Sequence, residues 1–161
     1  MQTEPKYKRV LLKLSGEALA AGADGILNFD FIVSVADALK KCVSAGVQVG
    51  VIVGAGNIWR GRQGFDMDRV RADQMGMLAT IMNSLVLKDT FTRIGCKVYN
   101  QSGLSVKMID DIDSGKAKEA IDDGKIVIFG GGTGKPFFST DTGAALRAID
   151  IGANVIVKLT N

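Results

Sequence analysis

The chain has 161 residues and a mass of 17.0 kDa, with 47% hydrophobic and 23% charged residues, as expected for one globular domain. Its net charge is +3 at pH 7, with lysine and arginine spread along the sequence, so no nucleic-acid or anionic-membrane partner is indicated. The chain contains no histidine, which argues against hydrolytic triads and zinc chemistry.

The N-terminal segment MQTEPKYKRV lacks the apolar stretch of a signal peptide, and no apolar run reaches the length of a membrane span. We therefore expect a cytoplasmic protein. Cys42 and Cys96 lie far apart and form no C-x-x-C pair, and we expect buried thiols instead of a disulfide. Glycine occurs 20 times, against an average usage of about 7%, and the excess is expected in tight turns or close to a ligand.

Strands and helices alternate along the chain. In chain order we expect a strand at 9–14, a helix capped by Asn28 that ends before Gly46, a strand at 47–54, a long helix from about 67 or 71 to 94, a strand at 97–101, a short helix at 114–121, a strand at 125–129, a helix at 140–151 and a strand at 153–159. This alternation predicts right-handed crossovers between parallel strands. The expected fold class is therefore α/β, a three-layer αβα sandwich with a mainly parallel twisted sheet, in a single domain over residues 1–161.

Two of the expected helices carry apolar residues at helical spacing. The first has an apolar face made of Phe29, Ile32, Val33, Ala36, Leu39 and Val43. The long helix has Met75, Leu78, Ala79, Met82, Leu85 and Val86 on one side, and such an amphipathic helix could supply a subunit interface. The run at 47–54 is apolar on both faces, which predicts a strand covered by helices on both sides.

Three glycine-rich loops follow expected strands. They are KLSGEA, GAGNIWRG and GGGTGKPFFSTDTGA. In open α/β sheets ligands bind beyond the carboxyl ends of the strands. Glycines at these ends let backbone N–H groups approach an anion, so phosphate is the expected ligand, although each loop taken alone could be no more than a tight turn.

Two common phosphate motifs do not fit these loops. A Walker A loop needs a hydroxyl residue after its Gly-Lys pair, and Pro136 stands there. A dinucleotide fingerprint needs a third glycine where the second loop has Trp59, and no acidic residue follows at the required strand end. The sequence therefore disfavours both a P-loop enzyme and a Rossmann dehydrogenase.

Two lysines lie near the ends of apolar strands. Lys13 lies inside the first strand, and Lys158 repeats the arrangement in the last. A buried lysine is costly unless an anion or a carboxylate pairs with it, although a lysine on an edge strand could also reach solvent. We expect both lysines to point into one crevice and to hold the two ends of a transferred phosphoryl group.

Four segments, in their order and spacing, resemble the bacterial-type uridylate kinases (UMP kinases) of the amino acid kinase family. They are KRVLLKLSGEAL, VGVIVGAGNIWRG, RADQMGMLATIMNSL and GGGTGKPFFSTDTGAALRAIDIGANVIVKLTN, and the resemblance runs from about Tyr7 to Asn161. It implies transfer of the γ-phosphoryl group of ATP to UMP, giving UDP and ADP in pyrimidine nucleotide biosynthesis. It also implies Mg²⁺ as cofactor, bridged by the nucleotide phosphates and not held by side chains.

The resemblance implies a set of site residues. Those expected to bind ATP are Lys13, Leu14, Ser15, Gly16, Gly56, Arg60, Thr160 and Asn161. Those expected to bind UMP are Ala55, Asp73, Thr133, Gly134, Lys135, Pro136, Phe137, Phe138, Ser139 and Thr140. The expected catalytic residues are Lys13, Asp141 and Lys158. Asp141 could instead cap the helix at 140–151, and the resemblance favours its contact with the two lysines.

The family's chemistry accounts for the missing histidine. The phosphate of UMP is already an anionic nucleophile, so no general base is needed, and catalysis rests on positioning and charge neutralisation. We expect Lys13 on the transferred group, the backbone N–H groups of Gly16 and Gly56 on its oxygens, and Arg60 closing over the site.

The family also implies partners. Its members are hexamers that GTP activates and UTP inhibits, so a homohexamer with these two regulators is expected. The segment AAGADGILN matches the family's GTP-linked stretch poorly. The C-terminal part of the family fold, which holds the base and ribose of ATP, is expected to be absent from this chain.

Two other functions stay open. A carboxylate-phosphorylating kinase of the same fold, such as an acetylglutamate kinase, would share KLSGEA and the glycine loops but would lack TGKPFFSTD. A non-catalytic nucleotide-binding protein could use the same scaffold, although the joint presence of Lys13, Arg60, Asp141 and Lys158 argues against it.

Overall fold

The computed structural model describes residues 4–61 and 66–160 of the chain. Strands and helices alternate as expected. The elements are β1 (Arg9–Leu14), α1 (Gly16–Ala20), α2 (Phe29–Ser44), β2 (Gln48–Val53), α3 (Arg69–Arg93), β3 (Val98–Ser102), β4 (Asp110–Asp111), α4 (Ser114–Asp122), β5 (Ile126–Gly130), α5 (Thr140–Ile151) and β6 (Val155–Leu159). The short elements α1 and β4 are the two that the sequence patterns did not predict.

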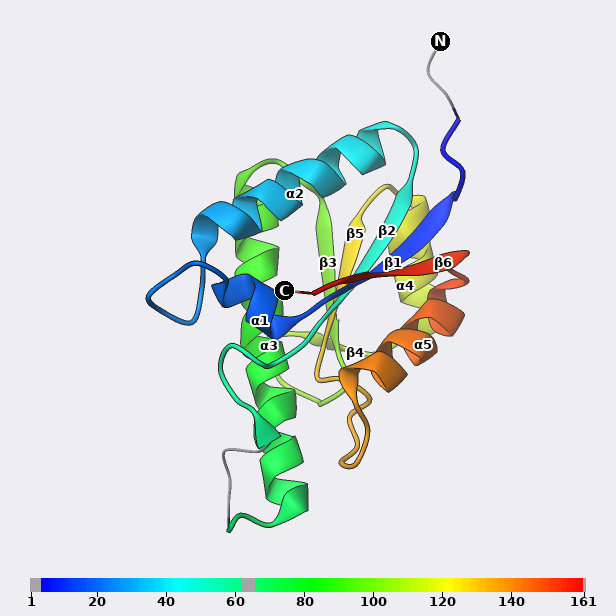
Figure 1. Ribbon diagram of the computed structural model, residues 1–161. Helices are drawn as coiled ribbons and strands as arrows, with labels where there is room; N and C mark the ends of the chain where they lie inside the picture. Colours follow the sequence, from blue (N-terminus) through cyan, green and yellow to red (C-terminus); the bar gives the residue numbers. More distant parts are fainter. Residues whose placement is uncertain (1–3, 62–65, 161) are drawn as a thin grey trace.

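The six strands form one sheet in the order β4-β3-β5-β2-β1-β6, and every neighbouring pair is parallel. Helices α2 and α3 cover one face, and α4 and α5 cover the other (Figure 1). The expected α/β fold, with a parallel sheet between two helical layers, is confirmed.

The two faces of the sheet bury two separate apolar clusters. Leu14, Val51 and Phe91 belong to the cluster beneath α2 and α3, whereas Ile52 and Phe129 belong to the cluster beneath α4 and α5. Successive side chains of a strand point to opposite faces, so β2 contributes to both clusters. This explains why the run at 47–54 is apolar throughout.

A polar hub joins the elements at the amino ends of the central strands. The guanidinium group of Arg9 donates to Gln48 Oε1 at 2.8 Å, to Asp122 Oδ1 at 2.7 Å and to the carbonyl oxygen of Ile151. Gln48 Nε2 also donates to Asp122 Oδ1 at 3.0 Å. These contacts tie β1 and β2 to the ends of α4 and α5.

The apolar faces expected on α2 and α3 are only partly buried. Asn28 caps α2 as predicted, with its Oδ1 accepting from Phe31 N at 3.0 Å, but Phe29 lies in the first turn and is 52% exposed. Along α3 the expected apolar side is divided: Ala79 is buried, whereas Met75, Leu78 and Met82 are exposed. The buried face of α3 combines apolar residues, such as Leu87 and Phe91, with polar side chains, among them Thr80, Asn83 and Ser84.

The expectation of buried cysteines is wrong for Cys42, which is exposed on the outer side of α2, and Cys96 is partly buried before β3. Both thiols are free. Partial burial raises the pKa of Cys96 above its ordinary value, so this thiol is protonated at neutral pH. Within the described ranges, no helix is long and apolar enough to cross a membrane.

Candidate functional site

The three glycine-rich loops lie at the carboxyl edge of the sheet, after the adjacent strands β1, β2 and β5. The strand ends are joined there by backbone hydrogen bonds. Ser15 N donates to Leu159 O at 3.0 Å, and Gly54 N donates to Leu14 O at 2.9 Å. The loops therefore start from one fixed rim, as the sequence predicted.

The first two loops pack together closely enough to require glycine. A Cβ atom on Gly16 would collide with the backbone of Ala55 and Gly56, and one on Gly56 would lie 2.8 Å from Glu17 Cγ. Between these glycines the backbones are in direct contact. The amide groups expected to contact phosphate oxygens, those of Gly16 and Gly56, therefore lie side by side.

Lys13 and Lys158 are direct neighbours in the register of β1 and β6. Lys13 Nζ lies 3.5 Å from Asp141 Oδ1, and Lys158 Nζ lies 2.9 Å from Asp141 Oδ2. The side chain of Lys13 is 13% exposed and that of Lys158 is 52% exposed. The structure brings the three expected catalytic residues into one cluster, with Lys13 as its shielded member.

In the structure Asp141 contacts the two lysines and does not cap α5. Ser139 caps α5, with its Oγ accepting from Thr142 N at 3.2 Å, so both carboxylate oxygens of Asp141 are left for the lysines. The hydrogen bond from Lys158 holds the pKa of Asp141 below its ordinary value, against the effect of partial burial, and the charge of Lys13 adds to it. Asp141 is thus a carboxylate at neutral pH and orients both ammonium groups.

Arg60 lies over the first two loops. Its Nε donates to Gly56 O at 3.1 Å, and its Nη2 lies 3.2 Å from Glu17 Oε1. The sequence patterns did not single out Glu17, which lies one residue after the Ser-Gly turn and pairs with Arg60 across the two loops.

A pocket of about 190 Å³ lies between the second loop, the first half of α3 and the loop after β5. Of the residues expected to bind UMP, those that line it are Ala55, Asp73, Thr133, Lys135, Phe138, Ser139 and Thr140. Gly134, Pro136 and Phe137 belong to the same loop but are not among its lining residues. Trp59, Gly76, Met77 and Thr80 also line the pocket and were not expected there.

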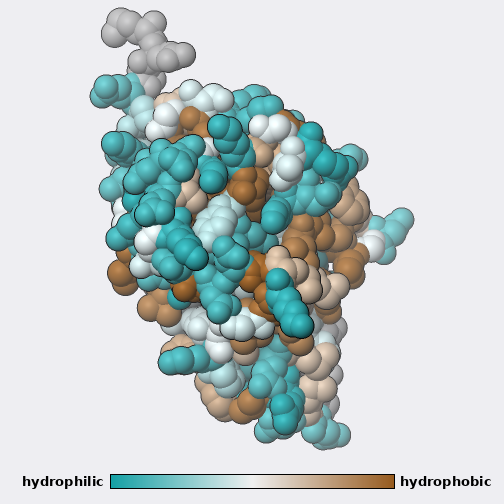
Figure 2. All heavy atoms as spheres, turned by 180° about the vertical axis from the view of Figure 1, so that it is seen from behind, coloured by the Kyte–Doolittle hydropathy of each residue, from teal (hydrophilic) through white to brown (hydrophobic). Residues whose placement is uncertain are grey.

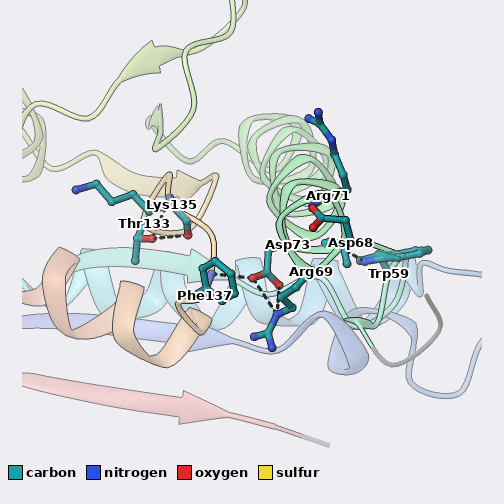
Figure 3. A network of polar contacts seen from close by, with 9 residues as sticks. Trp59, Asp68, Arg69, Arg71, Asp73, Thr133, Lys135 and Phe137 are labelled. Carbon is teal, nitrogen blue, oxygen red and sulfur yellow. Dashed lines mark hydrogen bonds and ion pairs between the residues drawn. The ribbon is translucent and has the colours of Figure 1, made fainter. Parts of the chain in front are cut away.

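Asp73 anchors the loop after β5 to helix α3 (Figure 3). Its Oδ2 accepts from Phe137 N at 2.7 Å, and Arg69 Nε donates to both carboxylate oxygens at 3.1 Å. Phe137 has φ of 69°, the left-handed region that is unfavourable for a side chain, and Arg69 lies over its ring at 5.5 Å. Asp73 therefore holds the loop in a conformation that its own backbone would not favour.

The shape of this loop depends on a neighbour that the sequence did not reveal. Gly134 has φ of 76°, and a Cβ on it would collide with the carbonyl group of Gly103, which follows β3. A Cβ added to Gly103 would in turn lie 2.9 Å from the carbonyl oxygens of Gly131 and Gly132. The sequence signal for Gly103 was only a glycine directly after a strand.

The other described residues expected to bind ATP lie at the ends of β1 and β6. Leu14 and Ser15 are buried at the end of β1, and Thr160 is exposed just after β6. Asn161 lies outside the described residues. Across the described ranges, no group of three or more His, Cys, Asp and Glu residues is placed to hold a metal ion.

The sheet order, the three rim loops and the lysine–aspartate cluster are accompanied by a sequence match. The pattern of the amino acid kinase family covers residues 8–161, and the chain belongs to this family.

Two solved structures show which members the chain is similar to. The UMP kinase from Ureaplasma parvum is 33% identical with a TM-score of 0.90, over 98% of this chain and 68% of that one. The UMP kinase from Bacillus anthracis is 35% identical with a TM-score of 0.92, over 98% of this chain and 66% of that one. The expected resemblance is confirmed, and the chain spans about two thirds of the length of these structures.

Proposed function

We propose that the protein is a nucleoside monophosphate kinase that transfers the γ-phosphoryl group of ATP to UMP, giving UDP and ADP in pyrimidine nucleotide biosynthesis. The observation that carries this proposal is the adjacency of the pocket and the charged cluster. Ser139 and Thr140 line the pocket, and Asp141, the next residue, pairs with Lys13 and Lys158. A phosphate bound in the pocket would therefore lie near two cations.

The donor nucleotide is assigned to the first two loops. Gly16 and Gly56 would present backbone N–H groups to the ATP phosphates beside Ser15, and Arg60 would close over them. Leu14, Thr160 and Asn161 complete the donor side on the family resemblance. Because the chain spans about two thirds of the length of its similar structures, binding of the ATP base is proposed for the whole protein.

The acceptor nucleotide is assigned to the pocket beside α3. Ala55 and Asp73 would contact UMP, and residues 133–140 would surround it. The proline after the lysine then presents no difficulty, since a loop that holds an acceptor phosphate needs no hydroxyl for a metal ion.

The chemistry follows from charge. In phosphoryl transfer the protein mainly positions the reactants and neutralises developing charge. Lys13, shielded from solvent and oriented by Asp141, is the residue best placed to stabilise the transferred group. Lys158 is more exposed and would neutralise the phosphates from the other side of Asp141.

A divalent cation fits this site only through the nucleotides. Asp141 already pairs with two lysines, so its carboxylate is not available as a ligand. Mg²⁺ in phosphoryl-transfer sites is commonly held by substrate phosphates with few carboxylates, and it would neutralise phosphate charge here.

Self-association and regulation are proposed with the function. The exposed stripe of Met75, Leu78 and Met82 on α3 would be covered in a homo-oligomer, for which the family resemblance suggests a hexamer. Figure 2 shows that apolar side chains reach the surface in patches on the face seen from behind. GTP as activator, UTP as inhibitor and a cytoplasmic location rest on the same resemblance.

The decisive experiment offers the purified full-length protein Mg-ATP together with UMP, CMP or acetylglutamate. We expect UDP alone. Phosphorylated acetylglutamate would identify the carboxylate kinase instead, and nucleotide binding without any product would identify a non-catalytic protein.

A further inference from the structure

Two of the four polar side chains that helix α3 buries lie one turn apart, Thr80 at 3% and Asn83 at 0% exposure. They lie on the face that points toward the rim loops. Burying a hydroxyl or an amide is unfavourable unless each polar atom has a partner. The hydrogen-bond partners of Thr80 and Asn83 therefore indicate the role of each side chain.

Thr80 contacts the loop after β5. Its Oγ1 donates to Met77 O at 2.7 Å and accepts from Gly131 N at 2.8 Å. The first bond fixes the hydroxyl within the helix, so that its lone pair points at Gly131. Gly131 opens the loop that lines the pocket and has φ of 73°. One hydroxyl thus attaches the start of this loop to α3.

Asn83 contacts the second glycine loop. Its Nδ2 donates to Gly54 O and to Asn57 Oδ1, both at 2.8 Å, and its Oδ1 accepts from Asn57 Nδ2 at 3.0 Å. Asn57 Nδ2 also donates to Ile26 O at 2.8 Å. The two amides form a reciprocal pair that holds the second loop on α3 and reaches the segment before α2.

We propose that Thr80 and Asn83 are positioning residues. They fix the loop after β5 and the second glycine loop to one rigid helix and so set the separation of the two bound nucleotides. This inference rests on the proposed kinase function. Positions 80 and 83 are one turn apart, so the spacing between their attachment points is set by backbone hydrogen bonds of α3 and not by the loops. Neither side chain is required to take part in the chemistry.

Thr80→Val tests the first attachment. Valine keeps the size of threonine but leaves Gly131 N–H without its acceptor. We expect the Kd for UMP to rise about tenfold, because about one buried hydrogen bond is lost. We also expect exchange of the Gly131 amide, measured by NMR, to accelerate by about the same factor. Thr80→Ser, which keeps the hydroxyl, should restore both.

Thr90→Val is the matched control. Thr90 lies on the same helix and is 1% exposed, and its hydroxyl accepts from Arg93 Nη2 at 3.5 Å within that helix. We expect UMP affinity and Gly131 exchange to stay within about twofold of the unmutated protein. Equal effects of Thr80→Val and Thr90→Val would overturn the proposal for Thr80.

Asn83→Ala and Asn57→Ala test the second attachment. The second variant leaves the core side of α3 intact, which covers the case in which Asn83→Ala fails to fold. For both we expect kcat and ATP affinity to fall about tenfold and UMP affinity to fall by less, because the second loop carries Gly56 and Arg60 on the donor side but contributes Ala55, Trp59 and Gly61 to a pocket that is lined mostly by other segments. A uniform loss of both affinities, or no change in either, would overturn the proposal for Asn83.

The single tryptophan of the chain, Trp59, gives a readout that does not need turnover. Trp59 lines the pocket and donates from Nε1 to Ala72 O at 2.9 Å, so its fluorescence should report UMP binding. If the unmutated protein bound no UMP, the proposed function would fail, while the Gly131 exchange comparison would still decide whether Thr80 holds the loop.

Discussion

Lys13 is the shielded cation of the candidate site, and Lys158 is its exposed neighbour on the adjacent strand. A charge held in place in a water-poor site stabilises a transition state more than the same charge in solvent, because the surrounding dielectric is lower. The two lysines are therefore not equivalent, although both pair with Asp141.

Lys13→Ala should reduce kcat by about 100- to 1,000-fold, the usual effect of removing one preorganised charge. Lys158→Ala, in which a more exposed cation is removed, should reduce kcat less. Steady-state kinetics gives the ratio, and thermal unfolding followed by circular dichroism checks that both variants fold. A greater loss for Lys158→Ala would reverse the assigned roles.

Asp141 makes a pH-dependent contribution to stability. Its pKa is lowered in the folded protein, so the contribution is present above the ordinary carboxyl pKa and is lost as pH falls through the lower folded value. Asp141→Asn should therefore have a lower melting temperature than the unmutated protein at pH 7. The difference should disappear only in strongly acidic buffer, and a difference independent of pH would contradict this account.

The loop after β5 is held from two sides. Asp73 fixes it to α3 through Phe137 N, and Gly103 packs against its glycines. The lining of the pocket is therefore set by contacts between loops and α3 as well as by the strands.

Asp73→Ala should weaken UMP binding by about tenfold, because the bond to Phe137 N is lost and the loop is released. Asp68→Ala is the control, since Asp68 caps α3 by accepting from Arg71 N at 3.1 Å. The cap variant should lose about 1 kcal/mol of stability with UMP affinity unchanged. Trp59 fluorescence and thermal unfolding measure the two effects.

Gly134→Ala and Gly124→Ala form a matched pair, because both glycines have φ of 76°. Around Gly124 a Cβ meets nothing within 4 Å, so alanine there adds only backbone strain of about 1–2 kcal/mol. At Gly134 the same strain is joined by a collision with Gly103. Denaturant unfolding should show the larger loss for Gly134→Ala, and equal losses would exclude the proposed role of Gly103.

The fold was predictable because its signals are local. The run at 47–54, apolar on both faces, and Asn28 before a helical stripe each indicate one element without knowledge of the rest. The polar contacts of α3 were not predictable in this way. Thr80 and Asn83 resemble surface residues in a periodicity pattern, and the same pattern treats the exposed Met82 as part of an apolar side. Their roles depend on loops distant in sequence.

The exposed stripe on α3 bears on self-association. Met82→Glu places a charge in this stripe and should reduce the molecular mass found by sedimentation at a given concentration. Met108→Glu is the control, since Met108 is 67% exposed and lies before β4. If neither variant changed the mass of an oligomeric protein, its interface would lie elsewhere.

The Arg9 hub gives the sheet two unlike rims. At the amino ends of the strands, charged and amide side chains bind one another; at the carboxyl ends, glycines let the loops pack closely together beside the lysine–aspartate cluster. The Arg9 contacts and the candidate ligand site thus lie at opposite ends of the strands. Ligand preference could therefore be changed by substituting side chains that line the pocket at the carboxyl ends, without altering the Arg9 contacts at the opposite ends of the strands.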